Sequence, residues 1–138
     1  YLYHDPCQSP MKQHQPLKVV NQLMNAELNG RIDNNDRCCG ESGTLAVTRP
    51  DVSTQVRMRK AEQLTRATKA LRADQPQAQV KILTSCPSCL QGLSRYQDEV
   101  GLDADYIVVE IARHTLGPDW MPRYVAQANQ GGIERVLV

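Results

Sequence analysis

Hydrophobic residues along the chain follow strand and helix spacings in alternation. Short apolar runs predict strands over four segments: 1–5, 80–85, 106–110 and 133–138. Apolar residues at helical spacing predict helices over 17–28, 50–73, 87–100, 111–116 and, more weakly, 119–130. Such alternation is typical of an α/β fold. We therefore expect a single domain over 1–138, with a largely parallel sheet flanked by helices.

The five cysteines lie at the edges of these elements or in loops, outside the apolar stripes: Cys7, Cys38, Cys39, Cys86 and Cys89. In an α/β sheet, the loops that follow strand carboxyl ends gather at one edge, where ligands bind. Cys7 follows the first predicted strand and Cys86 follows the strand at 80–85. We expect these two to converge, with the polar loop that carries Cys38 and Cys39 folding over them.

The Cys86-Pro87-Ser88-Cys89 segment has the local chemistry of a thiolate site. Pro87 suits the first position of a helix, which places Cys86 at the N-cap and Cys89 in the first turn. The partial positive charge of a helix N-terminus favours deprotonated sulfur. Residues three apart on a helical turn lie on the same side, so both sulfurs can face one metal centre.

The adjacent pair Cys38-Cys39 is the most informative feature. Structural zinc sites typically use cysteines two to four residues apart, whereas a cluster with several irons offers separate attachment points to neighbouring thiolates. Two alternatives stay open. One is a zinc-binding structural or interaction module. The other is a thiol–disulfide redox domain that uses Cys86 and Cys89 alone and leaves three cysteines unexplained.

Composition narrows the possible functions further. An odd number of cysteines argues against a closed set of disulfides, and we expect a reducing cytoplasmic location. The net charge of +1 and the scarcity of aromatic residues speak against nucleic acid as a partner, and no apolar run is long enough for a transmembrane segment. We identify no catalytic residues for acid–base chemistry.

Two other groups of residues have ordinary interpretations. His4 lies three residues before Cys7. We interpret it as a strand histidine with satisfied hydrogen bonds rather than as a ligand. Basic residues along 49–72, Lys60 among them, are interpreted as a solvated helix face, with docking of an acidic partner as the functional alternative.

Three segments of the sequence together resemble a known family: His4-Asp5-Pro6-Cys7, Arg37-Cys38-Cys39-Gly40-Glu41-Ser42-Gly43 and Thr84-Ser85-Cys86-Pro87-Ser88-Cys89. They are similar to the cysteine-rich "CCG" domain of heterodisulfide reductases and of the iron–sulfur subunits of glycolate oxidase systems. The variant found at the C-terminus of bacterial FAD-linked oxidases is the most similar. One departure is the gap before Cys86, which is longer than is usual in that family.

The resemblance implies an electron-transfer domain of an FAD-dependent 2-hydroxy acid oxidoreductase. It implies that all five cysteines, Cys7, Cys38, Cys39, Cys86 and Cys89, hold an iron–sulfur cluster, either a cubane or a non-cubane [4Fe-4S]; zinc is the alternative. FAD would belong to the parent protein, of which this chain is expected to be a C-terminal fragment. The implied partners are the parent's flavin domain or subunit and a downstream electron acceptor, in the cytoplasm or peripheral to the inner membrane through partners.

Overall fold

The computed structural model describes residues 1–9, 18, 21–22, 32–41 and 44–131. The chain divides into two compact units, Tyr1–Ile107 and Val108–Val138, which are described separately. All five cysteines lie in the first unit. The first unit is therefore the part of the chain that builds the site.

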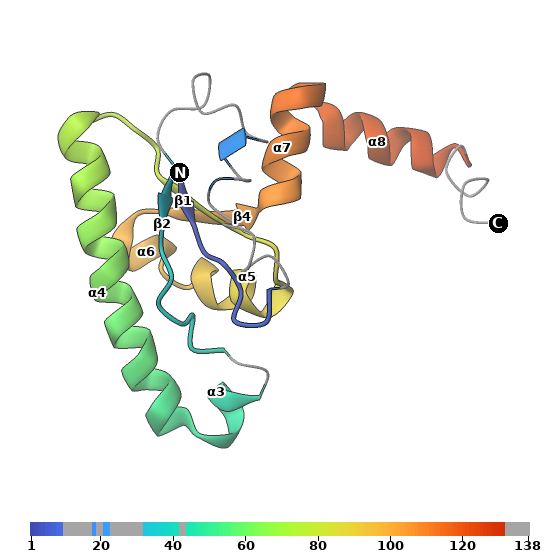
Figure 1. Ribbon diagram of the computed structural model, residues 1–138. Helices are drawn as coiled ribbons and strands as arrows, with labels where there is room; N and C mark the ends of the chain where they lie inside the picture. The colour runs from blue at the N-terminus through green and yellow to red at the C-terminus, as the bar shows by residue number, and fades with distance from the viewer. Residues whose placement is uncertain (10–17, 19–20, 23–31, 42–43, 132–138) are drawn as a thin grey trace. The chain divides into compact units, whose positions relative to one another are not determined.

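A four-stranded parallel sheet forms the centre of the first unit (Figure 1). Its strands are β1 (Leu2–Tyr3), β2 (Asp33–Asn34), β3 (Lys81–Thr84) and β4 (Asp103–Tyr106), in the spatial order β2-β1-β3-β4. Each neighbouring pair is parallel. The predicted α/β class with a parallel sheet is confirmed. Because the chain places β2 on one side of β1 and β3 on the other, β1 and β3 flank a topological switch point, where open α/β sheets bind ligands.

Helices connect these strands: α3 (Leu45–Thr48), α4 (Pro50–Asp74), α5 (Pro87–Ser94) and α6 (Gln97–Val100). Both α4 and α5 begin with proline, which has no N–H to lose at a helix start. Gly101 ends α6 in the left-handed conformation, with φ of 67°. In Figure 1, α4 is the long green helix beside the strands.

The core of the first unit lies between the sheet and these helices. Leu2 and Ile82 of paired strands are fully buried, as are Leu64 of α4 and Leu93 of α5. Leu102 covers the core next to β4. Apolar residues of the sheet and of α4 and α5 thus meet in one cluster.

The predicted strand at 106–110 is wrong. The strand is β4, Asp103–Tyr106, and Ile107 begins helix α7 (Ile107–Leu116). The β-branched run after Tyr106 has strand propensity, but β3 ends at Thr84, which pairs with Tyr106. After Tyr106 no partner strand remains among the described residues to continue the pairing. The chain therefore continues as a helix. On either side of the polar loop expected around Cys38 and Cys39, the chain also forms β2 and α3, which the sequence pattern did not predict.

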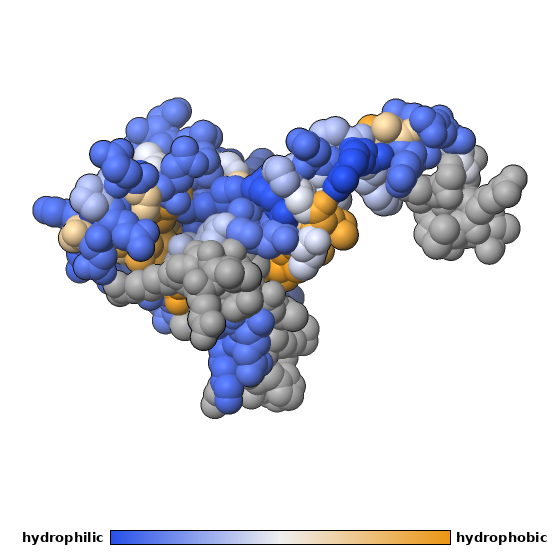
Figure 2. All heavy atoms as spheres, turned by 90° about the horizontal axis from the view of Figure 1, so that it is seen from above, coloured by the Kyte–Doolittle hydropathy of each residue, from blue (hydrophilic) through white to orange (hydrophobic). Residues whose placement is uncertain are grey.

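The second unit consists of most of α7 followed by α8 (Trp120–Asn129). Gly117, with φ of 92°, separates the two helices, as the Gly117-Pro118 pair predicts. Several exposed apolar side chains lie on α7 and α8: Val108, Leu116, Met121, Tyr124 and Val125. In the space-filling view of Figure 2, hydrophobic residues are few among mainly hydrophilic ones. Most of the helix predicted at 17–28, and the whole strand predicted at 133–138, lie outside the described residues.

No helix in the described part of the chain combines the length and the apolar character that crossing a lipid bilayer requires.

Replacing Leu64 with alanine tests the core. Leu64 has no exposed surface, so Leu64→Ala should lower the free energy of unfolding by about 2–5 kcal/mol. The neighbouring exposed Thr65→Ala should change it by less than about 0.5 kcal/mol. Urea unfolding of the reduced protein, followed by circular dichroism, measures both. Equal losses for the two variants would contradict this assignment of the core.

Candidate metal centre

The cysteines follow the carboxyl ends of three neighbouring strands. Cys7 comes after β1, the pair Cys38-Cys39 comes after β2, and Cys86 and Cys89 come after β3. Because the three strands are parallel, their carboxyl ends share one edge of the sheet. The expected convergence of distant segments on that edge is observed. The strand that delivers the adjacent pair, β2, is one that the sequence pattern did not predict.

Four of the cysteines line a common pocket of about 600 Å³. Cys7, Cys39, Cys86 and Cys89 are among its lining residues, with prolines and serines from the loops after β1 and β3 around them. Cys39 and Cys89 are buried, Cys86 is half-buried and Cys7 is exposed. The sulfurs thus run from the interior of the first unit to its surface.

Cys38 is the fifth cysteine, and it does not line the pocket that the other four share. Its side chain lines a second pocket, of about 510 Å³, together with Arg37, Val56, Arg59 and Glu62. The backbone N–H of Gly40 donates to the Cys38 sulfur over 3.4 Å. Burial raises the pKa of the Cys38 thiol, and the neighbouring Cys7 and Cys39 raise it further. Cys38 therefore lies against both Cys7 and Cys39.

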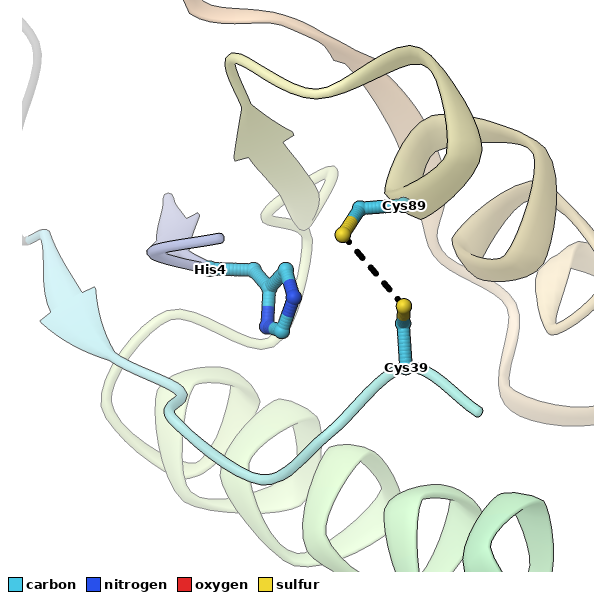
Figure 3. A group of neighbouring side chains, drawn as sticks. All are labelled: His4, Cys39 and Cys89. Carbon is cyan, nitrogen blue, oxygen red and sulfur yellow. Dashed lines mark hydrogen bonds between the residues drawn. The ribbon is translucent and has the colours of Figure 1, made fainter. Parts of the chain in front are cut away.

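The buried sulfurs of Cys39 and Cys89 lie 3.3 Å apart and share a hydrogen bond (Figure 3). The hydrogen bond with Cys89 strongly lowers the pKa of the Cys39 thiol; burial opposes the shift, and His4 and the Glu41 N–H assist it. The same bond and burial raise the pKa of Cys89. The two thiols therefore titrate as one pair.

His4 completes a compact group of three donors. The ligand atoms of His4, Cys39 and Cys89 all lie within 4.8 Å of one another, and all three residues are buried. The interpretation of His4 as a strand histidine with satisfied hydrogen bonds is correct for only one of its ring nitrogens. Nδ1 lies 3.1 Å from the Asn35 carbonyl oxygen, whereas Nε2 has no hydrogen-bond partner among the described residues.

A buried lysine lies directly behind this group. Lys60 of α4 has no exposed surface, and its ammonium donates to the backbone and side-chain oxygens of Asn35. It also lies 3.2 Å from His4 Nδ1. Burial lowers the pKa of Lys60 to about 8, while the charges of Cys39 and Asp36 act in the opposite direction. The interpretation of Lys60 as part of a solvated helix face is wrong.

The loop that carries Cys39 is held from two directions. The Ser53 hydroxyl of α4 donates to the Gly40 carbonyl over 2.9 Å, and Glu41 pairs with Arg95 over 2.6 Å. Gly40 has a φ of 86°, and a Cβ there would lie 2.8 Å from Arg57 Cγ. A glycine is therefore required after the cysteine pair.

The buried face of α4 held a signal for the polar residues of the site. Ser53 and Lys60 lie on the same helical face as Leu64 and Leu71, and all four are buried. When polar residues continue the apolar stripe of a helix, that end of the helix is expected to line a polar site and not the hydrophobic core. Asn35 and Glu41 gave no comparable signal, because their burial depends on contacts with distant segments of the chain.

The fold and the donors together define a parallel α/β domain with a thiol-rich centre at the carboxyl edge of its sheet. A family model described as "Cysteine-rich domain" (CCG) matches residues 1–94, and the chain belongs to this family. A second model, described as "Domain of unknown function (DUF3400)", matches residues 94–138. No curated protein and no solved structure matches the chain.

The donor set suits a soft metal ion or an iron–sulfur cluster. Thiolates and imidazole are the ligands that zinc and iron–sulfur centres use. Buried Lys60 and the N–H groups of Gly40 and Glu41 lie beside the sulfurs, where they offset thiolate charge. The residues present therefore fit a metal centre, and metal binding is the function that the site and the family indicate.

Gly92→Ala tests how closely α5 must approach the loop. A Cβ at Gly92 would lie 2.5 Å from Glu41 Cγ and 3.4 Å from the Cys39 carbonyl oxygen. We expect Gly92→Ala to cost about 1–3 kcal/mol of unfolding free energy and to weaken metal retention. The exposed Gln91→Ala on the same helix should leave both unchanged. Denaturant unfolding and metal analysis measure the effects, and a stabilised Gly92→Ala with full metal content would contradict this packing.

Lys60→Met tests the buried charge in protein stripped of metal. Lys60 loses its proton near pH 8 in the folded state but near its usual pKa of 10.5 when unfolded. Wild-type stability, relative to Lys60→Met, should therefore rise between about pH 8 and 10.5, by roughly 1.4 kcal/mol per pH unit. The exposed Lys69→Met is the control, and its pH curve should run parallel to that of the wild type. If the stability of Lys60→Met followed the same pH curve as that of the wild type, a lowered pKa of Lys60 would be excluded.

Proposed function

We propose that this domain holds an iron–sulfur cluster on Cys7, Cys38, Cys39, Cys86 and Cys89 and transfers single electrons. The observation that carries the proposal is the convergence of all five thiols, from three distant segments, on one edge of the sheet. Bound there, a [4Fe-4S] cluster would supply one-electron oxidation and reduction. The family membership supports a cysteine-ligated metal centre.

The adjacent pair favours a cluster over a single ion. Cys39 lines the pocket shared with Cys86 and Cys89, whereas Cys38 lines the neighbouring pocket and contacts Cys7. Two neighbouring thiols that reach different parts of the site suit a centre with several attachment points, of cubane or non-cubane type. A single tetrahedral ion would leave at least one of the five thiols unused.

The surrounding residues have definable tasks in this mechanism. Burial of Cys39 and Cys89 excludes water from the inner end of the centre, and exposed Cys7 marks the end nearest solvent, where a partner can exchange electrons. Backbone N–H groups and the Lys60 ammonium stabilise negative charge on the sulfurs. Both effects act on the reduction potential.

The parent enzyme in this proposal is an FAD-dependent 2-hydroxy acid oxidoreductase. Its flavin domain or subunit would take two electrons from the substrate, and this domain would pass them singly to a downstream acceptor. The chain would contribute no substrate chemistry of its own. The proposal places the domain in the cytoplasm, where thiols stay reduced, with any membrane association made through partners.

A zinc-binding structural module is the second candidate. The observation in its favour is the compact group of His4, Cys39 and Cys89, whose donors suit a zinc site with one nitrogen and several sulfurs. In that case the ion would tie the loops after β1, β2 and β3 together. Redox chemistry would then be absent.

Anaerobic iron and sulfide analysis with electron paramagnetic resonance tests the proposal. Wild-type protein should be brown, bind iron and sulfide, and give a signal on reduction. Cys39→Ala should lose most of its iron, whereas Ser88→Ala, which changes the same pocket without removing a sulfur, should keep it.

Three results would contradict the proposal. Stoichiometric zinc in a colourless protein would favour the structural module. Disulfide-reductase activity that depends on Cys86 and Cys89 alone would favour thiol exchange. Full iron content in Cys39→Ala would show that the cluster, if present, lies elsewhere.

A further inference from the structure

The unpartnered nitrogen of His4 faces the two innermost sulfurs. His4 has no exposed surface, and its Nε2 is a buried polar atom without a hydrogen-bond partner among the described residues. Figure 3 shows one edge of its ring turned toward Cys39 and Cys89. Burying such an atom without a partner is unfavourable. A buried donor atom left open toward two sulfurs indicates that something else binds there.

The other ring nitrogen is held in the manner of a metal-bound histidine. Nδ1 lies 3.1 Å from the Asn35 carbonyl oxygen, which can only accept a hydrogen bond. When Nδ1 carries the proton and donates it to this oxygen, Nε2 retains its lone pair. Metal-binding histidines commonly donate the second ring N–H to a backbone carbonyl in this way, which fixes both tautomer and ring orientation.

Lys60 anchors this arrangement. Its ammonium has only donors, and it binds both oxygens of Asn35, so the carbonyl that receives the His4 proton is itself fixed. Its Nζ also lies 3.2 Å from His4 Nδ1, so this side of the ring is held as well.

We infer that His4 is a nitrogen donor to the metal centre and binds through Nε2 beside Cys39 and Cys89. Asn35 is the positioning residue, because its carbonyl oxygen can accept the Nδ1 proton, and Lys60 holds Asn35 in place. The inference rests on the proposed function for the identity of the metal group. A neutral imidazole adds a donor without adding charge to a site rich in thiolates, and histidine in place of cysteine raises the potential of iron–sulfur centres.

Isotope labelling of histidine tests this in the wild-type protein. The cluster is loaded anaerobically with iron and sulfide, in protein grown with nitrogen-14 or nitrogen-15 histidine, and the paramagnetic state is examined by pulsed electron paramagnetic resonance. We expect a strong, isotope-sensitive coupling to a directly bound nitrogen. His4→Ala should abolish the coupling, whereas His114→Ala, in the second unit, should retain it.

The outcomes separate this inference from the proposed function. Bound iron and sulfide without a strong nitrogen coupling would overturn ligation by His4 and leave the cluster proposal intact. If the protein binds no iron, the cluster proposal fails, and the nitrogen-15 protein is loaded with cadmium-113 instead. Scalar coupling between cadmium and a histidine nitrogen, lost in His4→Ala, would support His4 as a ligand. An all-sulfur cadmium shift without that coupling would overturn it.

Discussion

The contact between the Cys39 and Cys89 sulfurs is the interaction on which the centre depends. It joins the loop after β2 to the first turn of α5 across the interior of the first unit, at 3.3 Å. Much of the neighbouring structure keeps this contact in place. Gly92 lets α5 approach the loop, and the Glu41–Arg95 pair and the Ser53–Gly40 hydrogen bond fix the loop between α5 and α4. Each of these contacts joins different elements of the fold, so the centre requires the complete first unit.

Charge is the second constraint on the site. Five thiols in one region would repel one another once deprotonated, and the buried ammonium of Lys60 supplies fixed compensation beside them. Burial of that ammonium is itself unfavourable, and the oxygens of Asn35 offset it through hydrogen bonds. The centre and its lysine therefore stabilise each other. This mutual dependence explains why a charged side chain occupies the face of α4 that elsewhere packs the core.

The sequence predicted the fold class and the meeting of the cysteines because both depend on local patterns. Alternating strand and helix periods indicate parallel crossovers, and parallel crossovers bring the loops after the strands to one edge. The strand at 106–110 was mispredicted because propensity alone cannot show that β3 ends at Thr84. The open nitrogen of His4 arises from contacts across the fold, which spacing does not reveal. Metal binding by the cysteines stays a prediction, and metal binding by His4 is an inference.

The position of β1 has a consequence for how the centre is made. β1 occupies an inner position in the sheet although it precedes the other strands along the chain, and Leu2 pairs with Ile82. During synthesis, its partner strand and the last two cysteines leave the ribosome long after β1 itself. If all five cysteines bind the proposed cluster, its insertion follows translation of most of the first unit. Until then Cys7, Cys38 and Cys39 remain accessible to the cell's oxidants and to competing metal ions. The time at which the metal is delivered therefore affects whether the centre forms.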